Sequence, residues 1–227
     1  MFYNMLSKST FILEKQHPGL YIDAEIMHTD EHFITCGGCV KNPTTSTPER
    51  IIKVWKIEEF DSLTQVIRMN SGHKRPIEHS FLMNKGHIVT LSSDKTVRFH
   101  NIVVGEVASI VETGFEPLSG CQLDYNSVVV GGNYNSLKIF DLRMRKSVLS
   151  PIRLNWELIQ VVNMARFTDH GLMVSNINEL HLLDIRNWKT RMLGEYEGER
   201  ISSILSLNEK DFVVGNKEKT YQIWECV

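Results

Sequence analysis

The chain has 227 residues, of which 42% are hydrophobic and 23% are charged, and its formal net charge is −2. This composition is that of a globular chain with a sizeable core, and it excludes an intrinsically disordered protein. The small negative charge argues against general binding to nucleic-acid phosphates, and no stretch approaches the roughly 20 apolar residues of a membrane-spanning helix.

The N-terminal sequence MFYNMLSKSTFIL lacks the continuous apolar core of a secretory signal. The 4 cysteines lie at irregular spacing, which favours reduced thiols over a disulfide framework. We therefore expect an intracellular protein of the cytoplasm, the nucleus or both, with no membrane partner.

Short apolar runs bounded by Gly, Asn, Asp and Ser recur along the chain, and helical periodicity is weak, which predicts many short β-strands. Five stretches share one order: an apolar strand, small residues, a polar turn and a second apolar strand. They span residues 33–57, 88–102, 128–142, 172–185 and 212–226. Their spacing of about 40 to 45 residues predicts a repeat architecture.

The two cysteines of the sequence TCGGCV, Cys36 and Cys39, lie in the first stretch at the spacing of a zinc knuckle or a redox pair. A structural zinc site needs two more ligands, and no second CxxC or paired-histidine motif follows. In the alignment of the repeats, Cys36 takes the place of Leu91, Val130 and Val214. We therefore expect Cys36 to be a core residue at a strand end, and we expect no metal and no cofactor.

Each repeat ends on an aromatic or apolar residue that is followed by a polar one. These pairs are Trp55-Lys56, His100-Asn101, Phe140-Asp141, Leu183-Asp184 and Trp224-Glu225. The second repeat also has Gly72-His73 before its first strand and Asp94 in its turn. An opening Gly-His, an Asp in the turn and a closing Trp-Asp mark the WD40 repeat. The chain therefore resembles the WD40-repeat family over essentially its whole length.

The resemblance implies an all-β fold, a WD40-like β-propeller of about five four-stranded antiparallel blades in a single domain over 1–227. The last repeat stops after its third strand. We expect the N-terminal strand, Ser9 to Lys15 within 1–15, to complete the last blade, as is common in the family. Seven blades are usual and need about 290 residues at this period. A closed five-bladed ring, an open propeller completed by a partner and a fragment all stay open.

Residues 40–50 form an insertion rich in Thr, Ser and Pro between the two strands of the first repeat. The same turn is tight in the other repeats, so the insertion predicts a mobile loop at the rim of the propeller. It is either an inert solvated loop or a recognition element, in which Thr47 before Pro48 could accept a phosphate.

In WD40 propellers, partners usually bind at the rim formed by the loops between blades and by the turns within them. The resemblance places four candidate partner-binding residues on this rim, namely His73, Arg75, Tyr134 and Trp156. Trp156 takes a position normally held by His. It is either an exposed interface residue or is wedged between blades.

Two neighbouring repeats end in Asp-x-Arg, and their arginines are Arg143 and Arg186. The first resembles the box with which WD40 substrate receptors dock onto the adaptor of cullin-4 ubiquitin ligases. An Arg just past a strand end can bond a partner's carboxylate or carbonyl groups. In unrelated WD40 blades the same Arg pairs or packs locally, so both interpretations stay open.

No nucleophile elbow, zinc-protease motif, phosphate loop or dinucleotide fingerprint is present, so we expect no catalytic activity. The sequence and the resemblance predict a non-catalytic scaffold or adaptor that binds other proteins in a multiprotein complex. One alternative is a substrate receptor of a cullin-4-type ubiquitin ligase. Another is an enzyme whose site at the channel mouth is assembled from separate blades.

Overall fold

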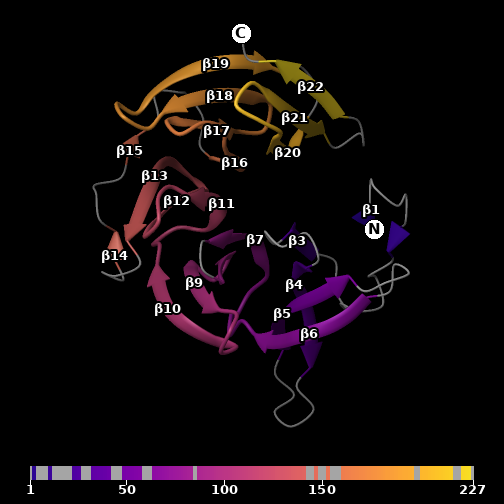
Figure 1. Cartoon of the computed structure of the whole chain (residues 1–227). Helices are drawn as coiled ribbons and strands as arrows, with labels where there is room; N and C mark the ends of the chain where they lie inside the picture. Colours follow the sequence, from indigo (N-terminus) through magenta and orange to yellow (C-terminus); the bar gives the residue numbers. More distant parts are fainter. Residues whose placement is uncertain are drawn as a thin grey trace. The chain divides into compact units, whose positions relative to one another are not determined.

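The computed structural model describes residues 2–3, 10–11, 22–26, 32–41, 48–57, 63–83, 86–141, 146–147, 152–153, 160–196, 200–216 and 221–225 (Figure 1). These residues form strands and turns, with no helix among them and therefore no helix that could cross a membrane. The predicted all-β class is confirmed. The chain divides into two compact units, Met1–Ile110 and Val111–Val227, whereas a single domain over the whole chain stays a prediction.

The first unit contains two four-stranded sheets whose strands lie side by side in chain order. Sheet 1 consists of β3 (Ile22–Ile26), β4 (His32–Lys41), β5 (Pro48–Ile57) and β6 (Leu63–Asn70). Sheet 2 consists of β7 (Ile77–Met83), β8 (His87–Ser92), β9 (Thr96–Asn101) and β10 (Glu106–Glu112).

The second unit contains three sheets with the same connectivity. Sheet 3 consists of β11 (Pro117–Gln122), β12 (Ser127–Gly132), β13 (Tyr134–Asp141) and β14 (Lys146–Ser147), and β15 (Ile152–Arg153) also pairs with β13. Sheet 4 consists of β16 (Asn163–Arg166), β17 (Gly171–Ser175), β18 (Glu179–Asp184) and β19 (Lys189–Glu195). Sheet 5 consists of β20 (Ile201–Ser206), β21 (Asp211–Asn216) and β22 (Tyr221–Glu225).

Each predicted repeat is the antiparallel hairpin formed by the second and third strands of one sheet, and the register is the same in all five. The final aromatic or apolar residue of the repeat lies opposite the start of the first strand. The pairs are Phe33–Trp55, Ile88–His100, Val128–Phe140, Leu172–Leu183 and Phe212–Trp224. Because antiparallel pairing decides which side chains share a face, positions can be compared from sheet to sheet.

This register confirms the core position of Cys36 and corrects its alignment. Cys36 is 1% exposed and lies opposite Ile52 in the core of sheet 1. Its equivalents in sheets 3 and 5 are Gly131 and Gly215, one residue after the valines predicted from the sequence, Val130 and Val214. A run such as VVVGG has the same apolar pattern in either register, so only the pairing distinguishes them. The side chain of Cys39 lies outside the described residues.

Neighbouring sheets stack through apolar faces. We call face A the side of a sheet that carries the final residue of its repeat, and face B the opposite side. Val129 and Ile139 on face B of sheet 3 share a core with Leu172 and Leu183 on face A of sheet 4. Face B of sheet 4 packs on face A of sheet 5 in the same way, and face B of sheet 1 packs on face A of sheet 2. In all three pairs of neighbouring sheets within a unit, face B of one sheet therefore forms a core with face A of the next.

Two N-terminal predictions differ from the structure. Thr10–Phe11, in the predicted closing strand, is β2 and pairs with β1 (Phe2–Tyr3) in a separate two-stranded sheet. The last sheet has three strands among the described residues, so its closure by residues 1–15 is not confirmed.

The ends of the 40–50 insertion are not a loop, because Val40 pairs with Glu49 and extends the β4–β5 hairpin. Residues 42–47, which include Thr47, lie outside the described residues.

Candidate functional site

A connected set of polar side chains links the turn before β7 to β8, the β8–β9 turn and the end of β9. The Nδ1 atom of His73 lies 3.0 Å from Asp94 Oδ2, and its Nε2 atom lies 2.8 Å from Thr90 Oγ1. Thr90 Oγ1 is also 2.8 Å from His100 Nε2. The resulting chain of four residues, Asp94–His73–Thr90–His100, is buried except at Asp94, which is partly exposed.

The hydroxyl group of Thr90 fixes the direction of these hydrogen bonds when both imidazoles are neutral. A hydroxyl has one hydrogen, so Thr90 donates to one imidazole and accepts from the other. Because Asp94 accepts from His73 Nδ1, Thr90 donates to His73 Nε2 and accepts from His100 Nε2. His100 Nδ1 is left as a buried acceptor without a hydrogen-bond partner among the described residues. Buried polar atoms in this state are rare and reduce stability.

Burial keeps both imidazoles neutral, whereas hydrogen bonds keep the carboxylate ionised. Burial lowers the pKa of His73, although Asp94 opposes this shift. Burial, together with the nearby His73 and Arg98, lowers the pKa of His100 to about 3. Burial disfavours the charged form of Asp94, but hydrogen bonds from Thr96, His73 and the Lys74 amide outweigh it and lower its pKa to about 2.

The network anchors residues 71–76, which we call the 71–76 turn. The Lys74 N–H group donates to Asp94 Oδ2 at 2.9 Å, and the Ser93 N–H group donates to the carbonyl of Pro76 at 3.2 Å. The hydroxyl group of Ser92 donates to the carbonyl of Arg75 at 3.1 Å. The backbone of the turn is therefore tied to the β8–β9 hairpin at successive residues, while the side chains of Lys74 and Arg75 are exposed.

Gly72 and Arg98 close the other side of the turn. Arg98 Nη1 donates to the carbonyl of Ser71 at 3.1 Å. Gly72 has φ of 71°, which favours glycine, and a Cβ atom added there would lie only 2.3 Å from Arg98 Nη1. The backbone conformation therefore favours glycine at this position, whereas the guanidinium group lies at the end of a flexible side chain and could move aside for a Cβ atom.

Parts of this arrangement recur in the other sheets. In sheet 1, Trp55 Nε1 donates to Thr35 Oγ1 at 2.9 Å, in the positions that correspond to His100 and Thr90. In sheet 3, Lys138 corresponds to Arg98, and its Nζ atom donates to the carbonyl of Thr113 at 2.6 Å. In sheet 2, His100 therefore takes the position that Trp55 has in sheet 1, and each of them bonds the threonine of its own sheet.

Of the predicted site residues, two lie in the 71–76 turn, one lies in the second unit, and three cannot be placed because their side chains lie outside the described residues. His73 is only 3% exposed, so its imidazole supports the turn from inside instead of facing a partner as predicted, while Arg75 is exposed in the same turn. Arg186, in the second unit, is exposed and bonds its neighbour: its Nη2 atom lies 2.7 Å and its Nε atom 3.3 Å from Asp184 Oδ2. This is the local pairing left open by the sequence. Arg143, Trp156 and the side chain of Tyr134 lie outside the described residues.

A comparison with protein-family models finds no match, and a comparison with curated proteins finds no similar sequence. The likeness to WD40 repeats therefore stays a prediction from the sequence.

Asp94→Asn is expected to destabilise the protein by about 1 to 2 kcal/mol, because the amide has only one acceptor atom for the donors that now share two carboxylate oxygens. Urea unfolding at neutral pH measures this loss. Asp169→Asn, at an exposed turn residue of the second unit, is the matched control and is expected to change stability by less than about 0.5 kcal/mol. Equal losses for the two variants would show that Asp94 does not anchor the turn.

Proposed function

We propose that the chain is a WD40-like β-propeller of about five blades that acts as a non-catalytic scaffold or adaptor and binds other proteins within a multiprotein complex. The propeller is supported by five hairpins with one register and by the regular stacking of face B on face A. Sheets that stack in this way form a rigid support for the turns between their strands.

The 71–76 turn carries the functional part of the proposal. Lys74 and Arg75 are exposed in it, and Lys95 is exposed in the β8–β9 turn beside Asp94. The backbone of both turns is held by the buried network, so ordering it costs little entropy when a partner binds. Three cations on a preformed surface are complementary to an acidic patch of a protein partner, which they would attract and orient.

Affinity purification of the intact chain from its native cells tests this function. The wild type is compared with the triple variant Lys74→Ala/Arg75→Ala/Lys95→Ala, and with a control of equal charge change, Lys189→Ala/Arg200→Ala/Lys210→Ala. The control removes exposed cations of the second unit. We expect the wild type and the control to retain an assembly that the turn variant loses.

Two results would contradict the proposal. Recovery of the same assembly by all three proteins would exclude the 71–76 turn as the binding surface. Recovery of no assembly by the wild type, under conditions that keep it folded, would exclude a scaffold. Because all six cations are exposed, each substitution is expected to change the free energy of unfolding by less than about 0.5 kcal/mol, which thermal unfolding checks.

A further inference from the structure

The third strand of sheet 5 has no strand on its outer side among the described residues. In sheets 1, 2 and 4, the corresponding strand is covered by β6, β10 or β19. In sheet 5, β22 pairs with β21 only, and all residues of β22 are exposed. An edge of this kind offers backbone N–H and C=O groups to another strand.

Face B of sheet 5 carries an exposed apolar row that leads to this edge. Leu205, Val213 and Ile223 are neighbours across the three strands, and Leu205 and Ile223 are 60% and 65% exposed. In sheet 3, Val129 and Ile139 take the positions of Val213 and Ile223 and are 0% and 5% exposed. A contiguous apolar row that is buried in one repeat and exposed in another indicates a binding surface.

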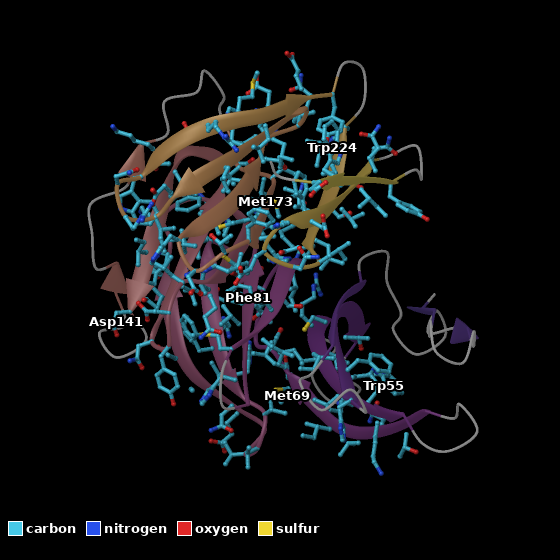
Figure 2. The ribbon with its side chains drawn as sticks, turned by 45° about the horizontal axis from the view of Figure 1, so that its top comes forward. Trp55, Met69, Phe81, Asp141, Met173 and Trp224 are labelled. Atoms are coloured by element: carbon cyan, nitrogen blue, oxygen red, sulfur yellow. The ribbon has the colours of Figure 1, made fainter. Side chains whose placement is uncertain are left out.

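The opposite face of β22, on face A of sheet 5, packs toward sheet 4. Trp224, labelled in Figure 2, lies on face A of β22. Its ring packs edge-on against Tyr196, the residue after β19, with 6.0 Å between the ring centroids. Face A of sheet 5 is therefore part of the core with sheet 4. On face B the side chains of β22 are exposed, and no strand among the described residues pairs with its outer edge.

Two acidic residues lie next to the apolar row. Asp211 and Glu225 are directly opposite each other on face B. Like charges in opposite positions of a sheet destabilise it, so a Lys or Arg placed beside Glu225 on an added strand would relieve the repulsion. The edge therefore favours a strand with a cation at this position.

Strand β6 of sheet 1 shows what completes a sheet of this type. Its Ile67 and Met69 lie opposite Val54 and Ile52 and pack on face B. Arg68, between them, points to the other face and is exposed. The completing strand thus has apolar residues at alternate positions, which matches the spacing of Ile223 and Tyr221 on β22.

We propose that β22 binds an extended segment of a partner protein by antiparallel strand addition. The segment has Lys or Arg opposite Glu225 and apolar residues two and four positions later, opposite Ile223 and Tyr221. Backbone hydrogen bonds supply much of the affinity in this mode, and the alternate side chains supply the specificity. This inference rests on the proposed binding function and identifies the chemistry of one partner.

Peptide binding to the full chain tests the inference. The probe is the labelled peptide Thr-Lys-Thr-Val-Thr-Ile-Thr, and its control carries Glu in place of Lys. We expect the Lys peptide to bind about fivefold more tightly than the Glu peptide, and Glu225→Lys to reverse this preference. Ile223→Asp is expected to weaken binding of the Lys peptide about tenfold, because it puts a charge in the apolar row. Val66→Asp, at an exposed position of β6, is the matched control and is expected to leave the affinity unchanged.

Hydrogen exchange identifies what occupies the edge. We expect alternate amides of β22 to exchange rapidly in the free chain and to be protected by the Lys peptide. Protection in the free monomer would show that a segment of the chain itself covers β22, and protection that rises with protein concentration would show pairing with a second copy. Either result, or equal affinity for both peptides, would overturn the inference. The scaffold proposal would then still be judged by the variant of the 71–76 turn, which leaves β22 unchanged.

Discussion

Replacing His100 with phenylalanine is expected to remove a large part of the acid sensitivity of the protein. Burial lowers the pKa of His100 from 6.5 to about 3 in the folded state. As the pH falls below 6.5, the unfolded chain binds a proton at this residue and the folded chain does not. The contribution of neutral His100 to the free energy of unfolding is therefore fully present above pH 6.5, and it is lost as the pH falls towards 3. At pH 4 the loss from His100 alone is expected to be about 3 kcal/mol.

Urea unfolding of the wild type and of His100→Phe at pH 7, 5.5 and 4 measures this effect. Phenylalanine suits the position because Phe140 occupies it in sheet 3. We expect the wild type to lose about 3 kcal/mol more than the variant between pH 7 and 4. The pKa of Asp94 is about 2, so its contribution is lost mainly below its ordinary value of 3.8 and outside this range.

The alkaline range, between pH 7 and 9, serves as the control for the comparison of the wild type with His100→Phe. Between pH 7 and 9 His100 is neutral in both states, so the unfolding free energies of the two proteins are expected to run parallel. If they also run parallel from pH 7 to 4, His100 is not held neutral in the folded protein. The buried chain from Asp94 to His100 would then need a different protonation state.

Gly132→Ala is expected to cost about 3 kcal/mol or more of the free energy of unfolding. A Cβ atom on Gly132 would lie 2.0 Å from the carbonyl oxygen of Glu116 and 2.8 Å from Cα of Pro117. Both atoms belong to the backbone where β11 starts, and Pro117 is the pairing partner of Gly132. The first strand of sheet 3 must therefore shift to accept a methyl group, and overpacking against a fixed backbone is strongly destabilising.

Gly215→Ala is the matched control, since this glycine lies at the end of β21 and its added Cβ would meet Ser203 Oγ at 2.6 Å. A serine hydroxyl can rotate away, so the expected loss is below about 1 kcal/mol. Thermal and urea unfolding of both variants measure the difference. Equal losses would show that the approach of β11 to Gly132 can relax.

The central hairpins could be predicted from the sequence because they carry the repeat. The spacing and the final residue, such as Trp55 or Trp224, locate both strands of each hairpin. The registers at glycine-rich strand ends could not be fixed to one residue. In VVVGG, moving the pairing by one position exchanges Val130 for Gly131 without changing the apolar pattern. The pairing of Thr10–Phe11 with β1 could not be predicted either, since a short apolar run does not specify which edge it pairs with.

The buried network was only partly visible in the sequence. Gly72-His73 and Asp94 matched the WD40 repeat, and His100 stands where the closing tryptophan of that repeat is expected. Thr90 gave no signal, because a threonine in an apolar strand is common and its role depends on two imidazoles that meet it in space. The exposed face of sheet 5 was equally hidden, since DFVVGN has the composition of a buried strand.

The pairing of strands in chain order has a consequence for how the protein folds. Apart from β15, each strand in the five sheets pairs with its neighbours along the chain. Forming a sheet therefore closes only short loops, which keeps the entropic cost of each closure small. Contacts of short sequence separation favour rapid folding compared with all-β proteins that pair distant strands. Whole sheets are accordingly expected to be the units that open and close together in native-state hydrogen exchange.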